Sequence, residues 1–331
     1  MKTQRIIVSL LVVIYVLICI AFQTEFAYAL SDQSNETART LNKKGVDLLG
    51  LGSYNEAIQN FDKALAIEPN DQVILANKGF ALHSLGNFSG ALQYYDKSLS
   101  IDPNDSATLN DKGLTLHELG KDNEAVQYYD KALAIESNNS QALNNKGLSL
   151  YSLGNYSGAI EYYDKALAIE PGYPVALSNK GFAILKLGNY FLDLGNYSQA
   201  IGYYDKQLAL NGSDPQALNN KGYALYSLGN YSGASEYYDK ALAIDPNDES
   251  AVDNKGILLL AEGKNNEALA YINKALSLDP NDVEALNGKG VVLANQGDNY
   301  EALKYIDKAL AIDPNHTTAL NNKQKILDMM K

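Results

Sequence analysis

A glycine recurs along this chain at nearly constant intervals, and this regularity constrains the fold more than any other feature. Successive glycines are 34 residues apart, except for one interval of 41 residues. They are Gly45, Gly79, Gly113, Gly147, Gly181, Gly222, Gly256 and Gly290. A fixed period of this length is typical of a solenoid, in which each repeat buries its apolar surface only against its neighbours. We therefore expect eight stacked repeats to occupy most of the 331 residues.

The repeat at 140–173 represents the others and predicts two helices. Its first half places Leu143 and Gly147 on one helical face, and its second half places Ala159 and Tyr163 on another. A Gly-Asn pair separates the halves, because glycine can end a helix in the left-handed conformation and asparagine can cap the next helix. Small residues at facing positions would let the two helices approach closely.

The same residues resemble a known family. The run Leu143, Gly147, Tyr156, Ala159, Tyr163, Ala166 and Pro171 is similar to the signature of the tetratricopeptide repeat, in its long superhelical type. The resemblance covers Ala38 to His316 and implies an all-α, right-handed superhelical solenoid of eight helix–turn–helix repeats. The chain departs from the family pattern in having no tryptophan and in placing a lysine before every repeat glycine.

The period predicts the boundaries of the repeats. They are 38–71, 72–105, 106–139, 140–173, 174–214, 215–248, 249–282 and 283–316. Residues 30–37 form a polar linker. Residues 317–331 begin the pattern again without a second helix, so we expect a C-terminal capping helix that covers the last core face.

The fifth repeat contains a seven-residue insertion, because the sequence LGNY at 187–190 occurs again at 194–197. Seven residues are two helical turns and leave the helix face almost unrotated. We expect the first helix of this repeat to continue through Leu194, with Gly188 inside it. The alternative is a helix that ends at Gly188 and a bulging loop after it.

The N-terminal segment predicts export. Lys2 and Arg5 precede an apolar run from Ile6 to Phe22, and Ala27-Tyr28-Ala29 fits an A-x-A cleavage site. We expect residues 1–29 to be a signal peptide, which makes the protein secreted or cell-surface. The alternative is an uncleaved anchor, because the apolar run approaches the ~20 residues of a spanning helix. The repeats would lie outside the cytoplasm in both cases, since the basic end stays inside.

Charge and cysteine content narrow the possible partners. Without residues 1–29 the chain has 25 basic and 38 acidic residues, a net charge of −13, which argues against nucleic acid and anionic membranes. Contact with a membrane is expected only if the N-terminal segment is uncleaved. Cys19 is the only cysteine, so the mature chain would have no disulfide. Acidic residues on the second helices, such as Asp130 and Asp239, are expected to form a solvated outer face.

The chain contains no sequence pattern that predicts catalysis. The phosphate-binding GxxxxGK[ST], the zinc-binding HExxH and the nucleophile pattern GxSxG are all absent. His83 and His117 occupy equivalent positions in neighbouring repeats, but no third ligand is evident, so we expect ordinary groove histidines and no metal. We predict a non-enzyme that needs no cofactor.

Asparagine recurs on the first helices, on the side opposite the predicted core. A primary amide can donate and accept together, so such a column could pair with the backbone of an extended peptide. Apolar residues run beside the column and could hold that peptide's side chains. The predicted peptide-binding residues are Asn77, Asn145, Asn179, Asn220 and Asn254, with Phe80, Leu148, Phe182 and Tyr223. The alternative is that the apolar column only packs the first helices together and the asparagines are solvated.

We therefore expect an exported, non-catalytic scaffold that binds a protein or peptide of unknown identity. The other possibilities are a structural cell-surface spacer and a glycan-binding module. Nine N-x-[ST] sequences could accept glycans, but asparagine and serine also cap helices at these junctions. The nine are Asn35, Asn87, Asn104, Asn138, Asn155, Asn196, Asn211, Asn230 and Asn315.

Overall fold

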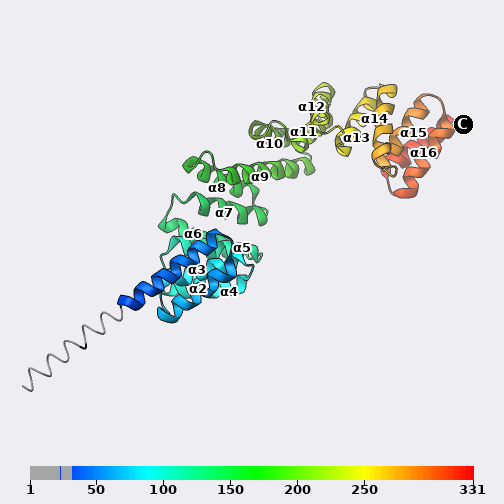
Figure 1. Cartoon of the computed structure of the whole chain (residues 1–331). Coiled ribbons are helices and arrows are strands. Elements are labelled where there is room, and N and C mark those ends of the chain that lie inside the picture. Colours follow the sequence, from blue (N-terminus) through cyan, green and yellow to red (C-terminus); the bar gives the residue numbers. More distant parts are fainter. Residues whose placement is uncertain (1–22, 24–31) are drawn as a thin grey trace, which may run out of the picture. The chain divides into compact units, whose positions relative to one another are not determined.

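The chain forms helices that are joined by short turns (Figure 1). This computed structural model describes Gln23 and residues 32–331, and every regular element in that part of the chain is a helix. None of the described helices combines the length and the apolar composition that crossing a membrane requires. The predicted signal peptide lies almost wholly outside the described residues. Two compact units divide the chain, and the second begins at Gly172.

The first unit contains four helix pairs, beginning with a helix over residues 32–50. We call the N-terminal member of each pair its first helix and the other its second helix. The remaining members are α2 (Tyr54–Ile67), α3 (Gln72–Ser84), α4 (Phe88–Ile101), α5 (Ser106–Glu118), α6 (Asp122–Ile135), α7 (Ser140–Ser152) and α8 (Tyr156–Ile169).

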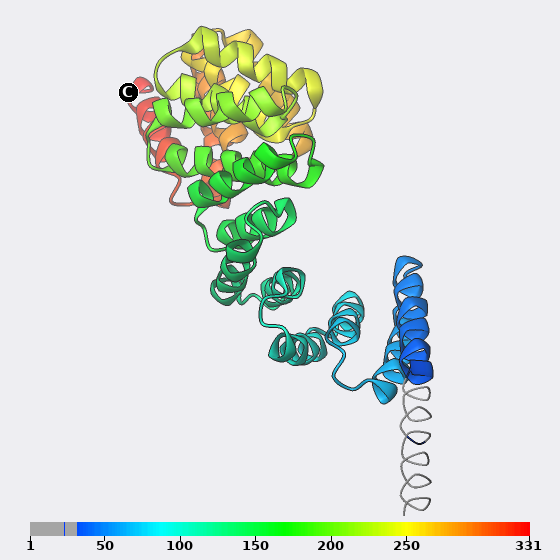
Figure 2. The same ribbon diagram turned by 90° about the vertical axis from the view of Figure 1, so that its left-hand side faces the viewer.

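The second unit contains four more pairs and a final single helix; Figure 2 shows both units from the side. Its helices are α9 (Pro174–Asp193), α10 (Tyr197–Leu210), α11 (Pro215–Ser227), α12 (Tyr231–Ile244), α13 (Glu249–Ala261), α14 (Asn265–Leu278), α15 (Val283–Asn295), α16 (Asn299–Ile312) and α17 (Thr317–Met329). The described part of the chain thus has the all-α repeat architecture that its periodicity predicts.

The predicted turn residues form the junctions within the pairs. Gly154 follows α7 with φ of 77°, a conformation in which a side chain would be strained. The side chain of Asn155 then accepts a hydrogen bond from the backbone N–H of Gly158 at 3.0 Å, which caps α8. Asn87, Asn196 and Asn230 cap their helices in the same way. Capping therefore accounts for the asparagine in four of the nine N-x-[ST] sequences.

A glycine and an aromatic ring hold the two helices of a pair together. The ring of Tyr163 on α8 is fully buried against Gly147 on α7. A Cβ atom at Gly147 would lie 2.6 Å from the ring, so no larger residue fits without a shift. Ala159 and Ala166 are also fully buried on the same face of α8. The small residues thus allow the close approach that the sequence predicts.

Neighbouring pairs meet mainly where the second helix of one pair packs against the first helix of the next, as α6 does against α7. Successive first helices also touch. α3 packs against α5, and α5 packs against α7. In the second unit the same succession runs from α9 through α11, α13 and α15 to α17. Consecutive second helices make no comparable approach among the described helices. The first helices of each unit thus lie next to one another on one face, which carries the predicted peptide-binding residues.

The insertion in the fifth repeat extends a helix and forms no loop. α9 continues for 20 residues and is capped at Leu194, which confirms the continuous-helix interpretation. Gly188, inside this helix, packs against Tyr204 as Gly147 does against Tyr163. Gly181, which the 34-residue period identified as the repeat glycine, instead lies beside Gln207. Helix pairing depends on the local spacing to the second helix, so the insertion transfers the glycine's role to Gly188.

The C-terminal helix covers the end of the second unit. Ala319 and Ile326 of α17 pack against Leu286, Ala302 and Ile306 of the last pair. These contacts bury an apolar surface that has no further repeat to cover it, as expected of a capping helix.

Candidate functional site

The nine predicted peptide-binding residues lie on the first helices α3, α7, α9, α11 and α13. Three of the aromatic residues are exposed, with 41% of Phe80, 58% of Phe182 and 40% of Tyr223 accessible to solvent. Leu148 is half-buried. Aromatic side chains that stay exposed on the first helices, away from the buried Gly–Tyr seams, are available to a partner.

The asparagines were predicted to bind a peptide, with solvated side chains as the alternative, but in the structure they bond to one another between repeats. Asn145 is only 7% exposed, and its side chain N–H donates to the Oδ1 of Asn110 on the preceding first helix at 3.1 Å. Its own Oδ1 accepts from Asn144 at 3.3 Å. We call this arrangement the amide ladder. Its remaining rungs join Asn77 to Asn42 (3.0 Å), Asn220 to Asn189 (2.9 Å), Asn254 to Asn219 (3.0 Å) and Asn322 to Asn287 (2.9 Å).

The amide ladder connects successive repeats within the protein. Each rung uses one of the two N–H hydrogens of the donor amide. A ladder amide could use its second N–H hydrogen and a carbonyl lone pair to form hydrogen bonds with a ligand as well. Asn179 is half-buried and lies in the N-terminal part of α9, seven residues before the position that corresponds to Asn145 once Gly188 takes the place of Gly147. The ladder thus stabilises the contacts between repeats. Sequence analysis did not predict this role, although adjacent asparagines are a signal for it and recur as Asn144-Asn145, Asn219-Asn220 and Asn321-Asn322.

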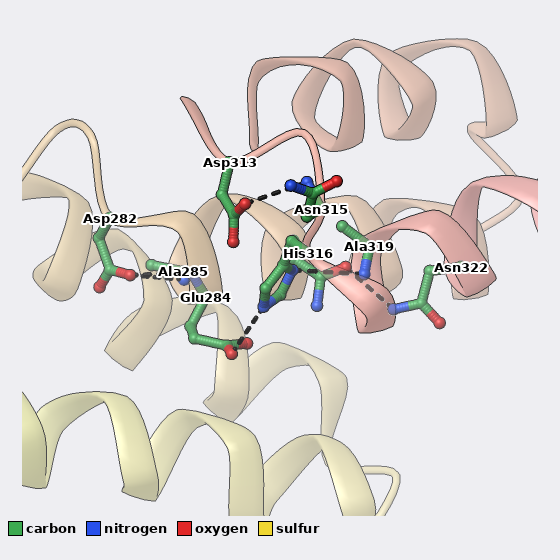
Figure 3. Close-up of polar contacts among 9 residues, drawn as sticks. Asp282, Glu284, Ala285, Asp313, Asn315, His316, Ala319 and Asn322 are labelled. Atoms are coloured by element: carbon green, nitrogen blue, oxygen red, sulfur yellow. Dashed lines mark hydrogen bonds and ion pairs between the residues drawn. The ribbon is translucent and has the colours of Figure 1, made fainter. Parts of the chain in front are cut away.

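At the C-terminal end a histidine strengthens the same kind of contact (Figure 3). The backbone N–H of Ala319 donates to Nδ1 of His316 at 3.4 Å, so this nitrogen must be an acceptor. Nε2 then carries the proton and lies 2.9 Å from Oε1 of Glu284 on α15. His316 therefore caps α17 and joins it to the preceding first helix.

In five repeats the lysine before the repeat glycine forms a second kind of link. Lys146 is buried and donates to Asp130 on the preceding second helix and to the Tyr162 hydroxyl oxygen at 2.7 Å. Burial lowers the pKa of Lys146, but the bonds to Asp130 and Tyr162 outweigh it, so its pKa is raised overall. Equivalent ion pairs join Lys78 to Asp62, Lys112 to Asp96, Lys221 to Asp205 and Lys255 to Asp239.

These ion pairs give the acidic second-helix residues a role in addition to the predicted solvated face. Asp130 and Asp239 are half-exposed, but each neutralises a buried lysine. The carboxylates are solvated as predicted, but the sequence analysis missed their ion pairs because the partner lysine lies 16 residues later, on the next helix.

Hollows open between successive first helices. One of about 530 Å³ between α3 and α5 is lined by Asn77, Phe80, Asp105 and Asp111, among others. Burial raises the pKa of Asp111 to about 6; a hydrogen bond from Asn110 opposes this effect and the nearby Asp105 adds to it. Asp111 occupies the ladder position of its repeat but faces no amide of the preceding one, where the equivalent residue is Ala76.

A different hollow results from the insertion in α9. It has a volume of about 270 Å³ and is lined by Leu177, Ser178, Gly181, Phe182, Gln207, Leu210, Asn211 and Asp214. We call it the α9 pocket. It contains the predicted residue Phe182 together with Gln207, which replaces the small residue of other second helices.

The histidines of the first unit also serve packing between repeats. Nδ1 of His83 lies 2.9 Å from Oγ1 of Thr115 in the next repeat. His117 forms an ion-pair contact with Asp122 at 2.5 Å and lies 3.4 Å from Oγ of Ser149. Within the described residues no group of three or more His, Cys, Asp or Glu side chains is arranged to hold a metal ion.

Sequence models of one protein family match most of the described chain. Models of the tetratricopeptide repeat match residues 48–110, 94–127, 140–173, 185–249 and 254–317, and a further TPR repeat model matches 113–154. No curated protein matches the chain.

Solved structures share the fold. The C-terminal part of a TPR repeat-containing protein from Cytophaga hutchinsonii is 20% identical, with a TM-score of 0.57; the alignment covers 74% of this chain and 97% of that one. PilW, a type IV pilus biogenesis factor, is 22% identical, with a TM-score of 0.46 and coverage of 65% and 96%. At these identities the likeness concerns the fold alone.

Proposed function

Because the chain belongs to the tetratricopeptide repeat family, whose members generally act as protein-interaction scaffolds, we propose that it binds an extended polypeptide on its first-helix face. The observation that carries the proposal is the exposed aromatic side chains on the first helices, which are Phe80 in the first unit and Phe182 and Tyr223 in the second. These rings are not needed to fill the Gly–Tyr seams, and Phe80 lines a hollow large enough for part of a peptide chain.

The polar residues of the same face support an extended ligand. Ladder amides lie on first helices of the second, fourth, sixth and seventh repeats, so their remaining N–H and C=O groups recur along each unit. An extended backbone likewise presents N–H and C=O groups at regular intervals. A peptide that follows this face could make several equivalent, individually weak bonds, each contributing about 0.5–1.5 kcal/mol.

The first experiment is affinity capture with the purified protein from the envelope and medium of the producing cell. Capture of a specific polypeptide, followed by titration calorimetry, supports the proposal. Retention of a polysaccharide supports a glycan-binding module, and no retained molecule supports a structural spacer.

Variants of the exposed aromatic residues on the first helices test the location of the site. Replacing Phe80 or Tyr223 with alanine should weaken binding of the captured polypeptide by about tenfold each, since a contact of ~1.4 kcal/mol is lost. Ile135→Ala is the matched control, because Ile135 is 47% exposed but lies on a second helix. Unchanged affinity in both aromatic variants would place the peptide elsewhere.

We also propose that the protein is exported, non-catalytic and free of cofactors. The basic residues, the apolar run and the Ala27-Tyr28-Ala29 sequence support export. N-terminal sequencing of native protein should yield Leu30 as the first residue. A start at Met1 with membrane-associated protein would instead support an anchored protein with external repeats.

A further inference from the structure

The α9 pocket exists because α9 is longer than the other first helices. Gly188 pairs with Tyr204, so the seven residues Pro174–Lys180 extend two turns beyond the end of this helix pair. Leu177 and Ser178 belong to the extension and form one wall of the pocket. The end of α10 and the turn before α11 form the other wall, with Leu210, Asn211 and Asp214.

A buried carbonyl in this pocket lacks a hydrogen-bond donor. Gln207 is only 5% exposed, and among the described residues nothing donates to its Oε1. Its Nε2 donates to Oδ2 of Asp214 at 2.7 Å. A carboxylate only accepts, so this bond fixes the amide orientation and leaves Oε1 facing Gly181.

The glutamine is peculiar to this repeat. The equivalent residues of the other second helices are Ala64, Ser98, Ala132, Ala166, Ala241, Ala275 and Ala309. A buried acceptor without a donor destabilises a protein, so a donor from a ligand would restore what the folded chain lacks.

The surroundings of Gln207 determine the kind of donor. Asp214 contributes a negative charge, and no lysine, arginine or histidine lines the pocket. Leu177, Phe182 and Leu210 are all substantially exposed and supply an apolar wall. The whole chain has a net charge of −12, which also attracts a cation.

We propose that the α9 pocket binds an arginine side chain of the partner polypeptide. The guanidinium donates to Oε1 of Gln207 and to the carboxylate of Asp214, while the aliphatic stem packs on Leu177, Phe182 and Leu210. Arginine fits better than lysine, because its planar fork has five N–H donors in fixed directions and can serve two acceptors together. This assignment rests on the proposed function and names one residue of the ligand.

Capped tripeptides test the assignment without knowledge of the partner. The probes are Ac-Ala-Arg-Ala-NH₂, its lysine counterpart, and its citrulline counterpart, which keeps the shape of arginine without the charge. Their affinities for the full chain are measured by NMR titration. The arginine peptide should bind about tenfold more tightly than the citrulline peptide, because charge-assisted hydrogen bonds are roughly twice as strong as neutral ones. Equal affinities of the arginine and citrulline peptides, or of the arginine and lysine peptides, would overturn the assignment.

Two variants locate the binding in the pocket. Asp214→Asn removes the charge but keeps a cap for α11, since Asn139 caps α7 in the same way. Gln207→Ala restores the residue of the other repeats. Each should lower the affinity for the arginine peptide about tenfold. Asp248→Asn is the matched control, because Asp248 caps the next first helix outside this pocket. An equal loss of affinity in Asp248→Asn would show that the arginine peptide is attracted only by the overall negative charge, and it would reject binding in the α9 pocket.

The captured polypeptide separates this inference from the proposed function. If it binds the wild-type chain and Asp214→Asn with equal affinity, the arginine site is rejected and the scaffold function stands. If no polypeptide is captured at all, the proposed function itself fails.

Discussion

At the scale of single residues, asparagine has a structural role that its polarity alone does not suggest. Asn145 receives a bond from Asn144, donates to Asn110 and is almost fully buried. An amide at this position satisfies polar atoms on both helices, whereas an apolar residue would leave them without partners.

Replacing Asn145 with alanine should therefore destabilise the protein. The free energy of unfolding should fall by about 1–3 kcal/mol, because the buried carbonyl of Asn110 loses its donor. Asn138→Ala, in an exposed turn of the same repeat region, should change it by less than ~0.5 kcal/mol. Urea denaturation followed by circular dichroism measures both; equal stability of the two variants would reject the structural role of the ladder.

Asp111 makes the stability of the first unit depend on pH. Its pKa is about 6 in the folded protein, raised by burial from 3.8, so the folded state favours the protonated carboxyl. This contribution is complete below pH 4 and is lost as the pH rises through 6. Between pH 4.5 and 7.5, Asp111→Asn should gain stability relative to wild type by on the order of 1–3 kcal/mol.

Thermal melts of both proteins across this pH range provide the measurement. Burial lowers the pKa of His83, but His83 is present in both proteins, so its effect cancels in the difference. A difference that stays constant with pH would contradict the raised pKa of Asp111.

At the scale of helices, the distance between the members of a pair depends on one glycine and the ring it faces. Gly147 faces the ring of Tyr163, whereas the equivalent Gly256 faces the smaller Ile272. A Cβ atom would lie 2.6 Å from the nearest ring atom in the first case and 3.4 Å from the nearest isoleucine atom in the second. The same substitution should therefore have opposite effects in the two repeats.

Gly147→Ala should lower the free energy of unfolding by about 1–3 kcal/mol through overpacking. Gly256→Ala should leave it unchanged or raise it by up to ~1 kcal/mol, because alanine is the better helix former. Chemical denaturation of the two variants makes the comparison. Hydrogen exchange in Gly147→Ala should increase most in α5 to α8, since a repeat is coupled mainly to its neighbours. Exchange that increases equally along the chain would contradict this local coupling.

At the scale of the whole molecule, stability comes from many similar contacts between neighbours. The apolar clusters of the second unit form successive groups along the chain, such as those around Ile272 and Ile306. A deletion that keeps the 34-residue period should consequently destabilise the protein less than one that breaks it.

Deleting residues 187–193 should leave a folded protein. The deletion restores the 34-residue spacing, so Gly181 can take the place of Gly188 opposite Tyr204. The helical signal and the urea midpoint should change little, whereas binding of the arginine tripeptide should be lost with the α9 pocket. Deleting the seven residues 217–223 from the 13-residue helix α11 is the control, and it should unfold its neighbours. If both deletions unfold the protein alike, α9 needs its full length for stability.

The sequence by itself determined the repeat, its two helices, the turn glycines and the capping helix. For the insertion it left a continuous helix and a bulging loop as alternatives, between which the structure decided. These features depend on local conformational preferences and on the repeat period, and both can be recognised by comparing residues along the chain. Only the tertiary structure decided that Lys146 pairs with Asp130, that Asn145 is bonded to Asn110, and that Gly188 replaces Gly181. The physical reason is that these contacts join different helices, where packing places side chains together whatever their separation in sequence.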